Sequence, residues 1–202
     1  MDRHPIDSQQ GGDPMSLPYL IVVTGEPGAG KSTFAEALSR EACLPLLSRD
    51  RIKEGCVHTW GLSAKELPPD ANLRATNLFF ETMGSLLEGG CSLIAEAAFQ
   101  HPLWSQRLTP WLNRARIRLC LCAPESREIA HERFLRRGLA DRRRGHYHGD
   151  RGVELARQGL AVDFADYAPP RLPVPTFRID TTGEYDPPLS VLIEQLFQAE
   201  EM

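Results

Sequence analysis

The sequence predicts an α/β fold in which helices cover both faces of a parallel sheet of five strands. The main observation behind this expectation is the alternation of short apolar, strand-like segments with helical patterns, which is typical of parallel sheets. A second observation is that most of the helical patterns begin or end at capping residues, glycines or prolines. The apolar segments span residues 19–24, 44–48, 91–95, 117–122 and 176–179.

The N-terminal half supplies three of the strands and two helices. The first helix is expected over residues 32–42 and the second over 70–87. Asp70 can cap the second helix, and Gly89 follows its end. The apolar positions at helical spacing are Phe34, Ala35, Leu38 and Ala42 in the first helix, and Leu73, Phe80, Met83 and Leu87 in the second.

The C-terminal half supplies the other two strands and three helices. One helix is expected over 125–137, stopping at Gly138, and another follows Asp150 and runs to a pair of prolines. The last has Asp186 as its cap and Pro187 in its first turn. The apolar positions of the last two helices are Val153, Ala156, Leu160, Phe164 and Tyr167, and Leu189, Leu192, Ile193 and Leu196.

Length and composition favour one folded domain. The chain has 202 residues, of which 42% are hydrophobic and 25% are charged, as is ordinary for a soluble globular protein. Residues 1–16 are polar and rich in Gly and Pro, so we expect a disordered tail followed by one domain over 17–202. A net charge of −4 gives no overall attraction to nucleic acid or to membranes.

The cysteines and the N-terminus predict a cytoplasmic protein. The 5 cysteines are an odd number without the spacing of a disulfide framework, which favours reduced thiols. The N-terminal residues do not have the pattern of a signal peptide. No apolar run approaches the roughly 18 residues that a membrane span needs. We expect no membrane partner and either a monomer or a homodimer.

A glycine-rich motif between the first strand and the first helix predicts a nucleotide site. Residues 25–32, "GEPGAGKS", fit G-x-x-x-x-G-K-[ST] without a mismatch. In this motif backbone N–H groups cradle phosphates, Lys31 reaches the β- and γ-phosphates, and Ser32 binds Mg²⁺. The expected fold is therefore the three-layer P-loop NTPase fold, with a nucleoside triphosphate and Mg²⁺ as cofactors; the family resemblance described below favours ATP. The expected nucleotide-binding residues of this cradle are Gly25, Glu26, Pro27, Gly28, Ala29, Gly30, Lys31, Ser32 and Thr33.

Other motifs separate the classes of P-loop protein. A GTPase would carry an Asn/Thr-Lys-x-Asp motif after a late strand, and the sequence has none. A motor-type ATPase would have an apolar strand that ends in Asp, whereas the best candidate strand here ends in Glu96. An ATPase or nucleotide-dependent regulatory protein without a phosphoryl acceptor remains the alternative function.

Asp50 is the candidate general base of a kinase. It ends the second strand about twenty residues after the cradle, where a parallel sheet would bring it beside the γ-phosphate. A carboxylate at that point could accept the proton of an acceptor hydroxyl. It could equally cap a short helix that begins at Arg51, and the two roles can coexist.

These motifs resemble those of small P-loop kinases of the nucleoside-monophosphate-kinase-like class. The nearest likeness is to the AAA-domain kinase family that includes polynucleotide 5′-hydroxyl kinases, zeta-toxin-type kinases, gluconate-kinase-like enzymes and chloramphenicol phosphotransferase. The resemblance implies transfer of a γ-phosphoryl group to a hydroxyl of a small molecule or of a nucleic-acid 5′ end. It implies that Asp50 is the base, that Glu96 occupies a position near the metal or the acceptor, and that the basic residues beside Asp50 contact the acceptor. Those residues are Arg49, Arg51 and Lys53.

An arginine-rich segment predicts a lid over about residues 136–150. The resemblance implies that Arg133 stacks on adenine and that Arg137, four residues later, contacts phosphate, with Arg142 or Arg143 closing over the γ-phosphate. A solvated run of charge and an RNA-binding segment are the other interpretations. His148, within this segment, is expected to be an exposed loop residue. The arginines concerned are Arg133, Arg136, Arg137, Arg142, Arg143, Arg144 and Arg151.

Overall fold

The computed structural model describes residues 17–198, and the side chain of Arg142 lies outside this description. Its centre is one sheet of five parallel strands in the order β2-β3-β1-β4-β5. The predicted tail of residues 1–16 lies outside the described residues. The strands are β1 (Tyr19–Thr24), β2 (Leu46–Ser48), β3 (Leu93–Glu96), β4 (Arg116–Cys122) and β5 (Thr176–Ile179).

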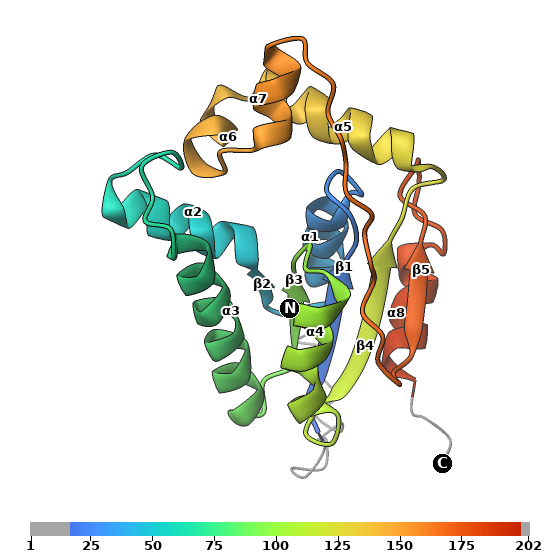
Figure 1. Cartoon of the computed structure of the whole chain (residues 1–202). Coiled ribbons are helices and arrows are strands. Elements are labelled where there is room, and N and C mark those ends of the chain that lie inside the picture. Colours follow the sequence, from blue (N-terminus) through green and yellow to red (C-terminus); the bar gives the residue numbers. More distant parts are fainter. Residues whose placement is uncertain (1–16, 199–202) are drawn as a thin grey trace, which may run out of the picture.

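Helices cover both faces of this sheet (Figure 1). The helices are α1 (Lys31–Ala42), α2 (Arg49–Trp60), α3 (Ala71–Glu88), α4 (His101–Leu108), α5 (Arg127–Ala140), α6 (Arg142–Tyr147), α7 (Arg151–Arg157) and α8 (Leu189–Phe197), with a 3-10 helix, η1, at Thr109–Trp111. In Figure 1, α5, α6 and α7 lie together across the end of the sheet where its strands finish. The predicted α/β class with a five-stranded parallel sheet is confirmed.

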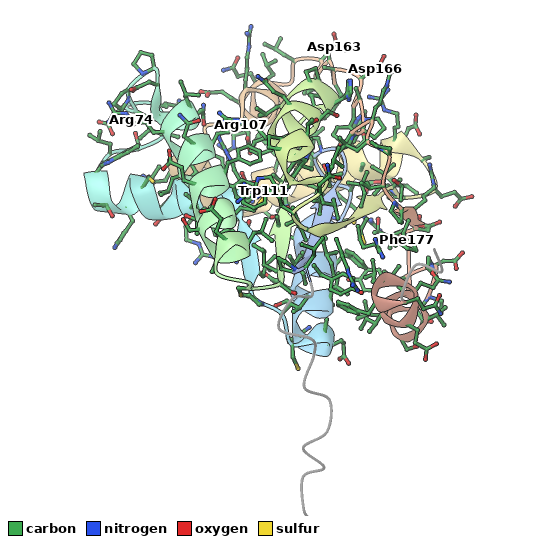
Figure 2. The ribbon with its side chains drawn as sticks, turned by 90° about the horizontal axis from the view of Figure 1, so that it is seen from below. Arg74, Arg107, Trp111, Asp163, Asp166 and Phe177 are labelled. Atoms are coloured by element: carbon green, nitrogen blue, oxygen red, sulfur yellow. The ribbon has the colours of Figure 1, made fainter. Side chains whose placement is uncertain are left out.

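Two apolar cores hold the three layers together. One lies between the sheet and α3 and α4, and includes Phe79, Met83 and Trp104, all at most 1% exposed. The other lies between the sheet and α1 and α8. Figure 2, seen from below, has Trp111 on the side of α3 and α4 and Phe177 on the side of α8. Each ring packs against the core of its own side.

Several helix boundaries differ from those that the sequence predicts. Helix α5 continues past Gly138, where the sequence predicts its end, to Ala140. Gly138 serves close packing there rather than termination, since a Cβ on it would lie 2.3 Å from Cγ2 of Val153 in α7. Asp186 does not cap the last helix; its backbone pairs with Asp180 in an isolated β-bridge, and α8 begins after Pro188.

The helix predicted after Asp150 is also shorter than expected, since α7 ends at Arg157. Residues 160–175, which we call the strap, then run without regular secondary structure from α7 to β5. Figure 1 shows the strap descending along the molecule from the α7 end to the foot of β5. Tyr167 of the strap bonds to Thr24, the last residue of β1 (2.6 Å between hydroxyl oxygens).

Helices α4 and α6 have no counterpart in the sequence-based prediction, and α2 corresponds only to the short helix from Arg51 that Asp50 could cap. Their sequences carry few regularly spaced apolar residues: the buried residues are only Lys53 and Val57 in α2, and only Trp104 and Leu108 in α4. Without an apolar stripe, the helical period is hard to recognise. Among the described residues, none of the helices is both long enough and apolar enough to cross a membrane.

Candidate active site

The cradle joins the end of β1 to the start of α1 at the centre of the sheet. Gly28 has a φ of +86°, and a Cβ on it would lie 1.9 Å from the carbonyl oxygen of Ala130 in α5. Gly25 has a φ of +147°, and a Cβ there would lie 2.3 Å from the carbonyl oxygen of Cys122. Only glycine fits these two positions, so the loop keeps the narrow curve that turns its N–H groups inward.

Lys31 is the buried cation of the cradle. Its Nζ donates to the backbone carbonyl of Glu26 at 2.8 Å, so the ammonium group lies across the loop. Burial lowers the pKa of Lys31, while the negative charge of Glu96 opposes this shift. A buried cation in a glycine-rich loop at the start of a helix has the charge and the position that a polyanionic phosphate chain would need.

Glu96 joins the cradle to the neighbouring strand. It is 3% exposed; its Oε1 accepts from the Ser32 hydroxyl at 3.3 Å and its Oε2 from the Ser48 hydroxyl at 2.6 Å. Ser48 and Glu96 are partners in the β2–β3 register, which accounts for the shorter bond. Burial raises the pKa of Glu96, opposed by the charge of Lys31 and by the bond from Ser48.

This oxygen-rich group fits a magnesium ion. Mg²⁺ prefers hydroxyl, carboxylate, water and phosphate oxygens, and usually takes only one or two protein ligands together with substrate phosphates. Ser32 and Glu96 supply such oxygens beside the cradle. No cluster of three or more His, Cys, Asp or Glu side chains that could hold a metal alone occurs within residues 17–198.

Asp50 lies in the first turn of α2 and faces the same cavity as the cradle. Asp50 does not hold the capping position that was one of its two predicted roles. Helix α2 begins at Arg49, so Ser48 occupies the N-cap. Arg49 Nη1 donates to Asp50 at 3.3 Å. Desolvation works to raise the pKa of Asp50, but the charges of His148 and Arg49 outweigh it, and the pKa is lowered. Asp50 is therefore an ionised carboxylate at neutral pH.

A cavity of about 980 Å³ brings these groups together. The cradle, α2, the end of β3, α5 and the segment 141–150 all line it. The sequence-predicted site residues on its wall are Pro27, Gly28, Gly30, Lys31, Ser32, Thr33, Arg49, Asp50, Arg51, Lys53, Glu96, Arg137 and Arg143. Residues far apart in the chain thus meet at the carboxyl ends of the strands, where ligands bind in parallel sheets.

Some predicted site residues do not line this cavity. Gly25, Glu26 and Ala29 belong to the loop but are absent from the cavity wall. The carboxylate of Glu26 instead lies 3.4 Å from Arg127 and 3.4 Å from His131, both in α5. Arg133 donates to the carbonyl oxygens of Thr181 and Thr182, in the loop after β5. Its predicted contact with adenine would have to be made from that position.

The arginines of the predicted lid have varied surroundings. Arg137 faces the cavity, and burial lowers its pKa. Arg143 is exposed and pairs with Asp141 at 3.2 Å, while Arg144 pairs with Asp150 at 3.6 Å. For Arg142 only the backbone, at the start of α6, is described.

His148 is the site residue that the sequence interpretation missed most clearly. We expected it to be exposed, but its side chain is only 6% exposed, and its Nε2 lies 2.8 Å from Oε1 of Glu54 in α2. Its carbonyl oxygen accepts from Nζ of Lys53 at 3.4 Å. Since Glu54 and His148 are 94 residues apart, no local pattern could have paired them.

The amino-acid sequence matches one known protein family. Residues 20–149 match the sequence profile of a family described as "AAA domain". No curated protein sequence matches the chain.

Comparisons of structure identify kinases with the same fold. A candidate kinase from Chloroflexus aurantiacus is 27% identical over 91% of this chain and 100% of its own, with a TM-score of 0.69. The APS kinase CysC of Mycobacterium tuberculosis, solved with AMPPNP and APS, is 16% identical over 90% of this chain and 98% of its own (TM-score 0.55). A sugar kinase from Janibacter is also 16% identical, over 88% and 91% (TM-score 0.52). The last two share the fold alone.

Proposed function

Because the chain belongs to the AAA domain family, whose profile covers residues 20–149, we propose that it is an ATP- and magnesium-dependent phosphotransferase that acts on a hydroxyl group. The observation that carries this proposal is the meeting of Lys31, Ser32, Glu96 and Asp50 around one cavity. The first three belong to the cradle and its neighbouring strand and suit a triphosphate. Asp50 lies across the cavity, where an acceptor would be.

In the proposed reaction the acceptor hydroxyl attacks the γ-phosphorus in line with the leaving group. The hydroxyl proton passes to the carboxylate of Asp50, a new O–P bond forms, and the bond from the γ-phosphorus to the β–γ bridging oxygen breaks to release ADP. The lowered pKa of Asp50 keeps the carboxylate ionised and ready to accept this proton.

The cations around the phosphates would stabilise the negative charge that develops during transfer. Lys31 and the cradle N–H groups would hold the β- and γ-phosphates, and Arg137 would face the transferring group from α5. Bound at Ser32, Mg²⁺ would neutralise phosphate charge. Glu96 orients the Ser32 hydroxyl through the bond between them. Residues 141–150, on the outer wall, would reduce the access of water and so favour transfer over hydrolysis.

The test combines a binding measurement with a search for product. Calorimetry with AMPPNP in magnesium buffer should detect binding to the wild type and none to Lys31→Ala. Lys65→Ala is a matched control, because Lys65 is exposed and pairs with Glu154 outside the cavity. ADP release and mass spectrometry with sugars, nucleosides, aminoglycosides and 5′-hydroxyl oligonucleotides should then reveal a phosphorylated acceptor. Slow ATP hydrolysis that no hydroxyl compound stimulates would instead identify an ATPase or a regulatory protein.

A further inference from the structure

We propose that the phosphoryl acceptor is a compact polyhydroxylated molecule bound between α2 and residues 141–150, and not the 5′ end of a polynucleotide. This inference rests on the proposed phosphotransferase function and names the class of its substrate. Three features of the described residues carry it: the chemistry of the cavity wall, the pairing of its charges, and the contacts that join residues 141–157 to the end of α2.

The acceptor end of the cavity is polar throughout. Except for Gly55, every residue that α2 and residues 141–150 contribute to its wall has a charged or hydrogen-bonding side chain. Six that face the space beside the cradle are Asp50, Glu54, His58, Tyr147, His148 and Asp150. Such a wall offers donors and acceptors to a molecule that carries many hydroxyl groups and few apolar atoms.

The same wall offers few platforms to a nucleobase: apart from the rings of His58 and His148, the ring that α2 and residues 141–150 contribute is that of Tyr147, which packs edge-on against His146. Protein sites for single-stranded nucleic acid stack the bases on aromatic rings along a basic groove. The aromatic cluster nearest to α3, which includes Phe79, Phe80, Phe99 and Trp104, packs in the core beneath the sheet ends. Trp60, at the end of α2, is absent from the cavity wall.

Four arginines of the acceptor end are paired with carboxylates, while Nζ of Lys53 donates to the carbonyl oxygen of His148. Each carboxylate that α2 and residues 141–150 place on the wall has an arginine within ion-pair distance: Arg49 with Asp50, Arg51 with Glu54, Arg143 with Asp141, and Arg144 with Asp150. A polyanion would have to break these pairs or leave carboxylates beside its phosphates. A neutral polyol can instead exchange hydrogen bonds with both signs of charge. These four arginines are therefore not free to bind a polyanion without giving up a carboxylate partner.

The lid region is joined directly to the segment that follows α2. The N–H of Ala64 donates to the carbonyl oxygen of His146 at 2.6 Å, and Nζ of Lys65 lies 2.9 Å from Oε1 of Glu154. Gly149 packs against Ala64 so closely that a Cβ on it would lie 3.1 Å from the Ala64 Cβ. These contacts, with the Glu54–His148 pair, close the side of the cavity between α2 and α6.

The volume of the cavity also favours a compact acceptor. Sites for a single drug-sized ligand commonly occupy about 300–1,000 Å³. Here about 980 Å³ must hold both the nucleotide and the acceptor. That volume leaves room for only a small acceptor beside the nucleotide.

The first experiment measures transfer from Mg-ATP to three sets of acceptors. These are polyols and sugars (glycerol, inositol, glucose, gluconate), nucleosides, and short 5′-hydroxyl DNA and RNA oligonucleotides. We expect a phosphorylated polyol or sugar, with a kcat/KM at least about tenfold above that of any nucleoside. The oligonucleotides should give no product and no saturable change in fluorescence anisotropy.

The outcomes separate this inference from the function on which it rests. Phosphorylation of an oligonucleotide, or a preference for nucleosides, would overturn the inference and leave a phosphotransferase. If AMPPNP binds but no acceptor in any set is phosphorylated, the proposed function fails and the inference falls with it.

A second experiment tests the closed side of the cavity through residues that lie outside its wall. Lys65→Glu and Glu154→Lys each place like charges together, and the double variant restores an ion pair with the charges exchanged. We expect each single variant to raise KM for the polyol roughly two- to fivefold, the range of an exposed ion pair, with KM for ATP unchanged. The double variant should recover most of the loss. Single variants with the wild-type KM would contradict closure of the acceptor subsite by these contacts.

Discussion

Asp50 shows how the surroundings of a residue prepare it for one chemical role. It stands in the first turn of α2, where a negative charge is favourable, and its interactions with His148 and Arg49 outweigh desolvation and lower its pKa below the ordinary value. A weak base that is fully ionised can accept a proton only as the hydroxyl loses it during transfer. Asp50 is therefore suited to act in the transition state rather than to deprotonate the acceptor beforehand.

Replacing Asp50 by Asn tests this role. Loss of a general base typically lowers the rate of transfer by about 10²- to 10⁴-fold, so we expect kcat to fall by that amount while the dissociation constant for AMPPNP stays unchanged. Asp70→Asn is the control, since Asp70 lies at the N-cap of α3 and pairs with Arg74 away from the cavity. Transfer at the wild-type rate by Asp50→Asn would leave Asp50 with a structural role only.

Glu96 should make stability depend on pH. Its pKa in the folded protein is raised above the ordinary 4.5, so the folded state holds this proton more tightly than the unfolded state does. The resulting stabilisation is complete below about pH 4.5 and is lost as the pH rises through the raised pKa.

The variant Glu96→Gln tests this dependence, because its side chain cannot ionise and its stability should not fall in this way. Urea unfolding of the two proteins without nucleotide should show the wild type losing stability relative to Glu96→Gln as the pH rises through this range. A constant difference at every pH would contradict a raised pKa.

At the scale of elements, α5 is the support of the cradle. Arg127, Ala130, His131 and Phe134 are spaced by three and four residues, so they share one face of α5. That face contacts Glu26 and Gly28 of the cradle, and Phe164 of the strap stacks on His131 with ring centroids 3.7 Å apart. Asp166 of the strap, labelled in Figure 2, pairs with Arg127 at 2.6 Å. The cradle, α5 and the strap therefore form one connected unit.

Gly28→Ala should disrupt the contact between the cradle and α5. The new Cβ would meet the backbone of Ala130, which cannot move without α5, and overpacking of this kind typically costs about 1–3 kcal/mol. We expect a lower melting temperature and AMPPNP binding weakened by about tenfold or more, since tenfold corresponds to about 1.4 kcal/mol. In Gly183→Ala, where a Cβ has nothing within 4 Å, both quantities should match the wild type. An unchanged nucleotide affinity in Gly28→Ala would show that the cradle tolerates a displaced α5.

At the scale of the whole molecule, two apolar cores hold the sheet edges in register. The Ser48–Glu96 bond and the position of Asp50 depend on β2, a short edge strand of residues 46–48 that pairs only with β3. The core between the sheet and α3 and α4 lies directly beneath this edge, and Leu47 and Ile52 pack against it. Packing remote from the cavity thus positions the candidate base.

Phe79 and Leu78 offer a matched pair for testing this core. Phe79 is fully buried among aromatic rings, and its replacement by Ala should lower the free energy of unfolding by about 3–5 kcal/mol. Its neighbour Leu78 is 45% exposed, so Leu78→Ala should change stability by about 0.5 kcal/mol or less. Urea denaturation of both variants measures the difference. Similar losses in the two would mean that the α3 layer is not packed as described.

How much of the fold could be read from the sequence depends on how each element is stabilised. Strands β1 and β4 and helices α1 and α3 carry continuous or periodic apolar residues, which repeat within a few positions and can be recognised locally. Helices α2, α4 and α6 lack such a stripe, and the strap was mistaken for an extension of α7 because its apolar residues happen to follow helical spacing.

The glycine-rich loop, the strand and helix on either side of it, and the alternation of strands with helices could be read from the sequence alone, because each depends on residues close together in the chain. Only the tertiary structure decided which side chains share the cavity. It joined Ser48 to Glu96 and Glu54 to His148, across 48 and 94 residues, and it paired Arg143 and Arg144 with Asp141 and Asp150. Such pairings follow from how whole layers pack against one another, and a local pattern of residues carries no record of that packing.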